Sequence, residues 1–155
     1  MMPIRTILCP TDFSDAAEHA VVYARDLAEK LGAKLLLLHV YELFRLALPV
    51  EGAVAVPPTW ASELSDRWQR MLEDTAARYR GTGVPITTLL RVGRAAEEVV
   101  RAAQSEGADL IVTGTHGRTG PSRLLLGSVA ERIVRSSPVP VLTVSPKAFS
   151  QAWKG

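Results

Sequence analysis

Glycines and a serine in the second half of the chain are spaced as an anion-binding site would require. Gly114 directly follows an apolar run, Gly117 lies three residues later, and Gly127-Ser128 follow after nine more residues, where a helix is expected to begin. Glycine allows close backbone approach and positive φ, and a helix amino terminus offers unpaired N–H groups at the positive end of its dipole. With the Ser128 hydroxyl as a further donor, the pattern predicts a cradle for an anion, above all phosphate.

Two residues elsewhere in the chain could complete a nucleotide site. Asp12 follows the first apolar run and could accept hydrogen bonds from ribose hydroxyls. Val40 ends the second apolar run and could line a flat slot for a base. Each feature also has a purely structural interpretation, because the glycines could be turn residues, Ser128 an ordinary N-cap and Asp12 a cap of the first helix. The spacing by itself leaves both interpretations open.

Familiar phosphate-binding motifs are missing from the sequence. There is no G-x-x-x-x-G-K-[ST] and no G-x-G-x-x-G after the first apolar run, which disfavours a Walker-type NTPase and a standard NAD enzyme. The charge of a bound phosphate would then be met by backbone amides, by Arg118 or Arg123, and by a magnesium ion carried by the nucleotide.

His116 lies within the glycine-rich loop and could act as a general base, because imidazole titrates near neutral pH. No G-x-S-x-G nucleophile elbow is present, so we expect His116 to donate a hydrogen bond to phosphate or to the loop backbone. His19 and His39 share no ligand spacing, and Cys9 is the single cysteine, so we expect no metal held by the protein. We assign no catalytic residue, and a slow nucleotide hydrolase or phosphotransferase that uses His116 or Asp12 is the alternative function.

The elements that must position these residues alternate between two hydrophobic periods. Short apolar runs are typical of buried strands, and apolar residues three and four positions apart are typical of amphipathic helices. We expect strands at residues 4–9, 34–40, 86–92, 109–114 and 141–144, and helices at residues 14–31, 62–80, 95–106 and 128–136. In the last helix, Val129, Ile133 and Val134 are expected to form the apolar face. The alternation predicts a single α/β domain over residues 1–155, with a parallel sheet covered by helices on both faces.

Two strand orders, 3-2-1-4-5 and 2-1-3-4-5, satisfy the right-handed crossovers of such a sheet. In the first order, the loops that carry Asp12 and Gly114 leave the sheet where the strand order reverses, which is where ligands bind in doubly wound folds. The same order puts the apolar strand 141–144 at an edge, and an exposed apolar edge is prone to pairing. We therefore expect a homodimer that forms through Val141 to Val144.

Composition places the chain among globular proteins. Its 155 residues are 47% hydrophobic and 22% charged with a net charge of +2, which indicates neither disorder nor a strong electrostatic field. We find no basic helix stripe for nucleic acid, no apolar run that could span a bilayer and no secretory signal. One cysteine cannot build a disulfide framework. A cytoplasmic location without nucleic-acid or membrane partners is the expectation.

The pattern Gly114-x-x-Gly117, nine residues, Gly127-Ser128 resembles the nucleotide-binding signature of the universal stress protein family. The stretch ILCPTDFS at residues 7–14 and the segment 124–142 are also similar to that family, and the similarity extends over essentially the whole chain. The resemblance implies a Rossmann-like five-stranded sheet of order 3-2-1-4-5. It also implies the ATP-binding subgroup, because this chain keeps the glycine signature whole.

The resemblance further implies a site for ATP, with magnesium carried by its phosphates. Asp12 and Gly114 would hold the ribose, and Val40 and Thr113 would flank the adenine. Together with the residues derived above from the sequence, the expected nucleotide contacts are Pro10, Thr11, Asp12, Val40, Thr113, Gly114, His116, Gly117, Arg118, Gly127, Ser128 and Val129. The implied function is a dimeric sensor or regulator of the stress response, with at most a weak ATPase activity.

Overall fold

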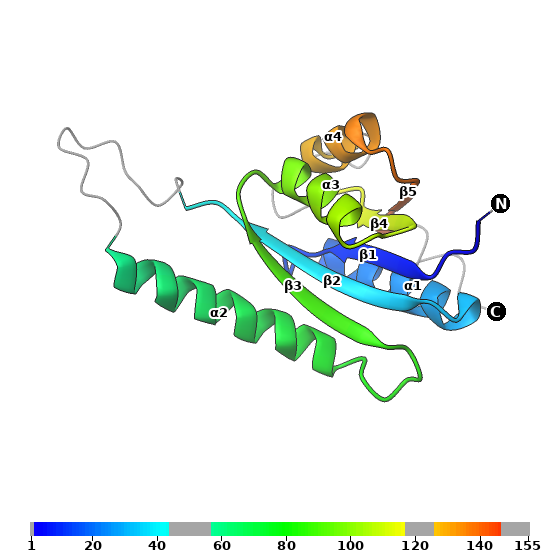
Figure 1. The fold of residues 1–155 in the computed structure, drawn as a ribbon, viewed down its shortest axis with the longest axis horizontal. Coiled ribbons are helices and arrows are strands. Elements are labelled where there is room, and N and C mark those ends of the chain that lie inside the picture. Colours follow the sequence, from blue (N-terminus) through cyan, green and yellow to red (C-terminus); the bar gives the residue numbers. More distant parts are fainter. Residues whose placement is uncertain (1, 44–56, 117–125, 147–155) are drawn as a thin grey trace.

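A parallel sheet with helices on both of its faces forms the centre of the molecule (Figure 1). The structure is a computed structural model that describes residues 2–43, 57–116 and 126–146. Within these ranges, strands β1 (Thr6–Pro10), β2 (Lys34–Tyr41), β3 (Ile86–Val92), β4 (Leu110–Gly114) and β5 (Val141–Val144) alternate with helices α1 (Asp15–Leu31), α2 (Pro58–Ala77), α3 (Ala95–Ser105) and α4 (Ser128–Ser136). The predicted α/β alternation is confirmed.

The strand order is β3-β2-β1-β4-β5, and every neighbouring pair runs parallel. β1 lies at the centre, where Ile7 pairs with Leu35 of β2 on one side and with Leu110 of β4 on the other. This confirms the order 3-2-1-4-5 and excludes 2-1-3-4-5. Because the order reverses between β1 and β4, the loops that follow these two strands leave the same edge of the sheet at adjacent positions.

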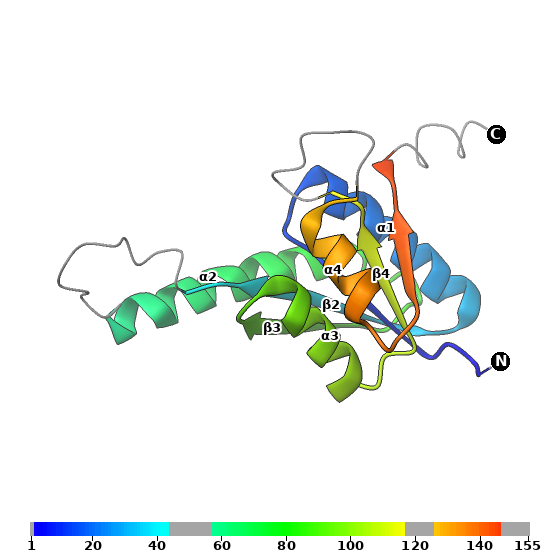
Figure 2. The same ribbon diagram turned by 90° about the horizontal axis from the view of Figure 1, so that it is seen from above.

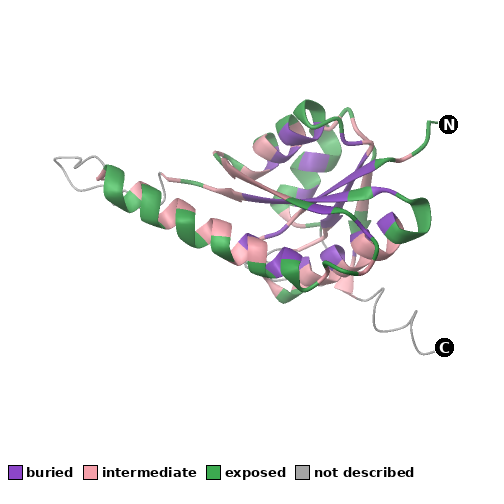
Figure 3. Cartoon of the chain, turned by 60° about the horizontal axis from the view of Figure 1, so that its bottom comes forward, coloured by how far each residue is buried: buried purple, intermediate pink, exposed green. Residues whose placement is uncertain are grey.

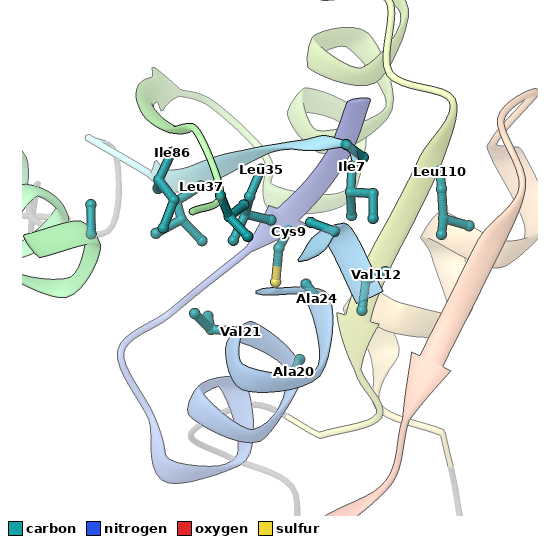
Figure 4. Packing of buried hydrophobic residues seen from close by; sticks show 14 of the residues in the cluster. Ile7, Cys9, Ala20, Val21, Ala24, Leu35, Leu37, Ile86, Leu110 and Val112 are labelled. Atoms are coloured by element: carbon teal, nitrogen blue, oxygen red, sulfur yellow. The ribbon is translucent and has the colours of Figure 1, made fainter. Parts of the chain in front are cut away.

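Alternate strand residues point to opposite faces of the sheet, and each face carries its own hydrophobic cluster. One cluster joins the sheet to α1 and α2 through residues that include Ile7, Cys9, Leu35, Leu37 and Val112 (Figure 4). The other joins it to α3 and α4 through residues that include Leu8, Leu36, Leu38, Ile111 and Ile133. Figure 2 shows the helices of the two layers from above, and Figure 3 shows the buried central strands between exposed helix faces. Burial from both sides explains why the central strands are nearly continuous apolar runs.

The boundaries of α2 differ from the sequence-based expectation. The helix begins at Pro58 instead of Ser62 and ends at Ala77 instead of Arg80. Proline is favoured in the first turn of a helix, because the N–H group that it lacks would have no intrahelical partner there. Pro58 therefore opens the helix four residues before the expected start at Ser62.

The predicted apolar face of α4 is wrong in part. Ile133 is buried as expected, but its buried companion is Ala130, three positions earlier. Val129 is 43% exposed and Val134 is 47% exposed, because each lies next to a buried position and is rotated away from the sheet. Separately, no helix in the described ranges is long and apolar enough to cross a membrane.

Candidate functional site

The loop between β1 and α1 carries Asp12 and is shaped by short-range hydrogen bonds. Oδ1 of Asp12 accepts a hydrogen bond from the backbone N–H of Ser14 at 3.0 Å and another from the Ser14 hydroxyl. Ser14 is the N-cap of α1, and its Oγ accepts from the N–H of Ala17 at 3.2 Å. Asp12 is therefore not the cap itself, but it orients the residue that caps the helix.

Thr11, just before Asp12, is tied to β2. Its N–H donates to the carbonyl of Leu38 at 2.8 Å, and its own carbonyl lies 2.8 Å from Nδ1 of His39. Its hydroxyl accepts a hydrogen bond from the N–H of Phe13 at 3.1 Å. Thr11 is buried, so the backbone that leads into Asp12 is held by β2 and by its own turn. No motif in the sequence signals a contact between Thr11 and His39, so the part played by His39 could not be predicted from the sequence.

Gly114, the last residue of β4, lies against the first turn of α1. A Cβ atom placed on Gly114 would lie 3.3 Å from the carbonyl oxygen of Ala16, closer than ordinary van der Waals contact. The missing side chain thus lets the end of β4 approach the start of α1. This close contact brings the loop that carries Asp12 next to the loop that follows β4.

Gly127 joins the start of α4 to the end of β4. Its N–H donates to the carbonyl of Thr115 at 2.6 Å, and a Cβ atom on Gly127 would lie 2.8 Å from that same oxygen. A contact this short cannot persist, so a glycine is required for reasons of space. Gly127 is the N-cap of α4, which makes Ser128 the first helical residue and excludes the interpretation of Ser128 as the cap.

The other predicted contacts line the same edge of the sheet or fall outside the described ranges. Pro10 ends β1, and the half-buried Val40 packs on the cluster beneath α3 and α4. Thr113 is buried, and its hydroxyl donates to the carbonyl of Gly114 at 3.3 Å. Nδ1 of the half-buried His116 lies 2.9 Å from the Thr115 hydroxyl. Three predicted nucleotide contacts remain. Val129 is exposed, and Gly117 and Arg118 lie outside the described ranges.

The described part of the candidate site consists of the carboxyl ends of the paired strands β1 and β4 and of the helix starts attached to them. The Asp12 carboxylate belongs to the loop after β1, and the first N–H groups of α4, with the exposed Ser128, are joined to the end of β4 through Gly127. Such an edge can take a ligand that carries both hydroxyls and an anion. Nowhere in the described ranges do three or more His, Cys, Asp or Glu side chains gather as metal ligands would.

Cys9, which lies just before this edge, offers no nucleophile. The side chain is fully buried in the cluster beneath α1 (Figure 4). Burial raises the pKa of the Cys9 thiol far above its usual range, and the nearby Glu18 carboxylate raises it further. The thiol therefore stays protonated and packs as a small apolar group.

Comparison with known proteins gives one consistent family. The model of the universal stress protein family matches residues 3–145. The chain is 32% identical to Universal stress protein MJ0577 of Methanocaldococcus jannaschii, over 92% of this chain and 96% of that protein. It is 39% identical to a universal stress protein of Thermus aquaticus, over 90% of this chain and 98% of that protein.

Comparison with solved structures indicates the same family. The structure of MJ0577 superposes with a TM-score of 0.79 at 31% identity, covering 93% of this chain and 97% of that one. A universal stress protein crystallised in complex with cAMP superposes with a TM-score of 0.66 at 27% identity, covering 93% of this chain and 98% of that one.

Proposed function

The chain belongs to the universal stress protein family, and we propose that it binds an adenine nucleotide, with ATP as the expected ligand, at the sheet edge between β1 and β4. The observation that carries the proposal is the hydrogen bond from Gly127 to Thr115, which ties the amino end of α4 to the end of β4, the strand that pairs with β1. The solved relative in complex with cAMP supports a ligand of the adenine class.

In the proposed complex, the ligand would lie across both loops. The phosphates would lie at the amino end of α4, where Gly127 and Ser128 offer N–H groups and the helix dipole favours negative charge. The Asp12 carboxylate would accept hydrogen bonds from the ribose, and Val40 would line the slot for the base. Magnesium would enter with the phosphates, because it keeps most of its water ligands and needs few protein oxygens.

We further propose that the protein retains its nucleotide and hydrolyses little of it, acting as a sensor or regulator of the stress response. Oδ1 of Asp12 already accepts two hydrogen bonds from Ser14, and Nδ1 of His116 is occupied by the hydroxyl of Thr115. These hydrogen bonds make Oδ1 of Asp12 and Nδ1 of His116 poor acceptors for the proton of an attacking water. This arrangement supports binding over turnover.

Titration calorimetry with ATP, AMP and cAMP in the presence of magnesium tests the proposal. We expect saturable binding of ATP with one site per chain and a very low rate of phosphate release. A mass spectrum of the small molecules released from freshly purified, denatured protein identifies which nucleotide the protein retains. Several turnovers per second that disappear in His116→Ala would instead favour the hydrolase or phosphotransferase. No binding of any of the three nucleotides at millimolar concentration would contradict the assignment.

We also propose that two copies pair through β5, which lies at an edge of the sheet. The carbonyls of Pro140 and Val144 accept hydrogen bonds from β4 and from the residue that follows it. Because successive residues of a strand direct their backbone groups to alternate sides, the N–H and C=O groups of Val141 and Thr143 point to the open side. These groups could pair with the same strand of a second copy around a two-fold axis.

A further inference from the structure

Phe13, which directly follows Asp12, has a backbone conformation that a residue with a side chain disfavours. Its φ is +64°, and no other non-glycine residue in the described ranges has a positive φ. A bulky residue in the left-handed region is an outlier, because its Cβ atom approaches the following carbonyl. Strain of this kind persists only where the surroundings impose it, and it gathers at functional sites. The surroundings of Phe13 must therefore hold it in this conformation.

An aromatic cluster of Phe13, His39 and Trp68 supplies the restraint. The Phe13 ring stacks on Trp68 of α2, with centroids 5.8 Å apart and planes 4° apart. His39 of β2 lies 4.6 Å from the Phe13 ring and 4.7 Å from the Trp68 ring. The buried indole N–H of Trp68 has no hydrogen-bond partner among the described residues. Ring packing therefore places Trp68, and the cluster joins the loop of Asp12 to both β2 and α2.

His39 also holds the backbone of this loop. Its Nδ1 lies 2.8 Å from the carbonyl oxygen of Thr11, and since a carbonyl only accepts, Nδ1 carries the proton and donates. The C=O of Thr11 and the N–H of Asp12 belong to one planar trans peptide unit, in which they point in opposite directions. Fixing the carbonyl on His39 thus also fixes the direction of the Asp12 N–H, away from β2 and α2.

We propose that His39 is a positioning residue for nucleotide binding. Its hydrogen bond to the Thr11 carbonyl keeps the Asp12 carboxylate where it can meet the ligand, and its contact with the Phe13 ring is secondary to that hydrogen bond. His39 does not itself touch the nucleotide, because it faces α2, whereas the next residue, Val40, faces the opposite side of the sheet. The inference rests on the proposed function, since it concerns how the same site is assembled.

Two substitutions separate the hydrogen bond from the ring. His39→Leu and His39→Asn both remove the imidazole and its contacts with Phe13 and Trp68, but the amide nitrogen of asparagine comes close to the position of Nδ1 and still donates to Thr11. We expect His39→Leu to raise the dissociation constant for ATP by about tenfold or more, because the buried Thr11 carbonyl loses its donor. We expect His39→Asn to stay within about threefold of the wild type, because the donor is kept.

Amide hydrogen exchange of the nucleotide-free protein gives an independent measure of the loop. The N–H groups of Phe13 and Ser14 are bonded within the loop to Thr11 and Asp12. We expect them to exchange about tenfold faster in His39→Leu and nearly unchanged in His39→Asn, while amides inside α1 stay protected in both and show that the variants are folded.

The outcomes separate this inference from the proposed function. If the wild type binds no adenine nucleotide, the proposed function fails, and exchange at Phe13 and Ser14 still decides whether His39 positions the loop. Unchanged exchange in His39→Leu overturns the positioning role even when ATP binds. Faster exchange with unchanged ATP affinity overturns its bearing on binding. Equal losses in His39→Leu and His39→Asn also overturn it, because the donor would then be irrelevant.

Discussion

Gly114 and Gly127 are required by the space around them, not by backbone freedom. Gly127 has a φ of −61°, which any residue adopts, yet a Cβ atom there would lie 2.8 Å from the carbonyl oxygen of Thr115. At Gly114 the obstacle is the carbonyl of Ala16 at 3.3 Å. Both obstacles are backbone atoms, which cannot rotate away as a side chain can. The two glycines are therefore needed for the close contacts of β4 with α1 and α4, whether or not a ligand is bound.

Gly127→Ala should disturb both stability and binding. The added methyl group forces the start of α4 away from Thr115, which should lower the free energy of unfolding by about 1–3 kcal/mol. The same displacement moves the proposed phosphate donors, so ATP affinity should fall by about tenfold or more, equivalent to ~1.4 kcal/mol. Urea unfolding and calorimetry measure the two effects.

The matched control is Gly107→Ala, which adds the same methyl group shortly before the amino end of β4, whereas Gly127 lies beyond its carboxyl end. Gly107 has a φ of +62°, and no atom of its surroundings comes within 4 Å of the place that the methyl group would take. This substitution should cost about 1–2 kcal/mol through backbone strain alone and leave ATP affinity unchanged. Equal losses of affinity in both variants would mean that general destabilisation, not the geometry at Gly127, governs binding.

Among the elements, α2 is held against α1 and β3 by hydrogen bonds of polar side chains near its carboxyl end. Glu18 of α1 accepts hydrogen bonds from Arg78, at 3.3 Å, and from the Tyr79 hydroxyl. Glu73 of α2 accepts from Thr88 of β3, and this hydrogen bond is the main reason why the pKa of Glu73 is lowered. These contacts set the position of the helix that brings Trp68 onto the loop of Asp12.

The contact between Tyr79 and Glu18 should make stability depend on pH in the alkaline range. Burial, and then the hydrogen bond to Glu18, raise the pKa of Tyr79 from 10.0 to about 12. The folded state thus binds the phenolic proton more tightly than the unfolded state. Its contribution to stability is complete below pH 10.0 and is lost as the pH rises toward about 12. Urea unfolding across this range should show a decline that is reduced in Tyr79→Phe.

Tyr23→Phe, on α1, provides the comparison for this measurement. Tyr23 packs against the same cluster, so the substitution removes a phenolic hydroxyl without touching the contact between Tyr79 and Glu18. The variant should keep the alkaline decline of the wild type. If Tyr79→Phe shows the same decline as the wild type and Tyr23→Phe, the Glu18 contact does not control it.

The sequence predicts elements better than it predicts their contacts. Each described strand and helix was expected at its place, because the change of hydrophobic period is local and visible in the residues. The start of α2 at Pro58 and the exposure of Val134 depend on finer choices that periodicity leaves open. The stack of Phe13 on Trp68 joins residues far apart along the chain. Neither a period nor a motif records such a contact, so only the structure reveals it.

Across the whole molecule, the strand order decides which surfaces remain available. Periodicity allowed two orders, and the family resemblance selected the one that the structure has. With β1 and β4 adjacent, the predicted contacts Asp12 and Gly114 share one edge, and β5 becomes the outer strand next to β4. The same topology thus supports both the proposed ligand site and the proposed dimer.

Thr143→Pro should separate the proposed dimer with little loss of stability. The N–H of Thr143 points to the open side of β5, so proline removes a donor to the second copy and none to β4. Leu142→Pro is the control, since it removes an N–H that faces β4 and should destabilise the monomer instead. Light scattering at micromolar concentration measures the mass, and urea unfolding measures stability. A monomeric wild type at that concentration would reject the dimer.

The hydrogen bond between Gly127 and Thr115 has a consequence for how the start of α4 is held. It ties together the two points where the chain leaves the end of β4 and returns to α4. Because donor and acceptor are both backbone groups, this closure depends on no side chain at either anchor, apart from the absence of one that the space at Gly127 requires. The main chain alone therefore fixes the first turn of α4 to the sheet.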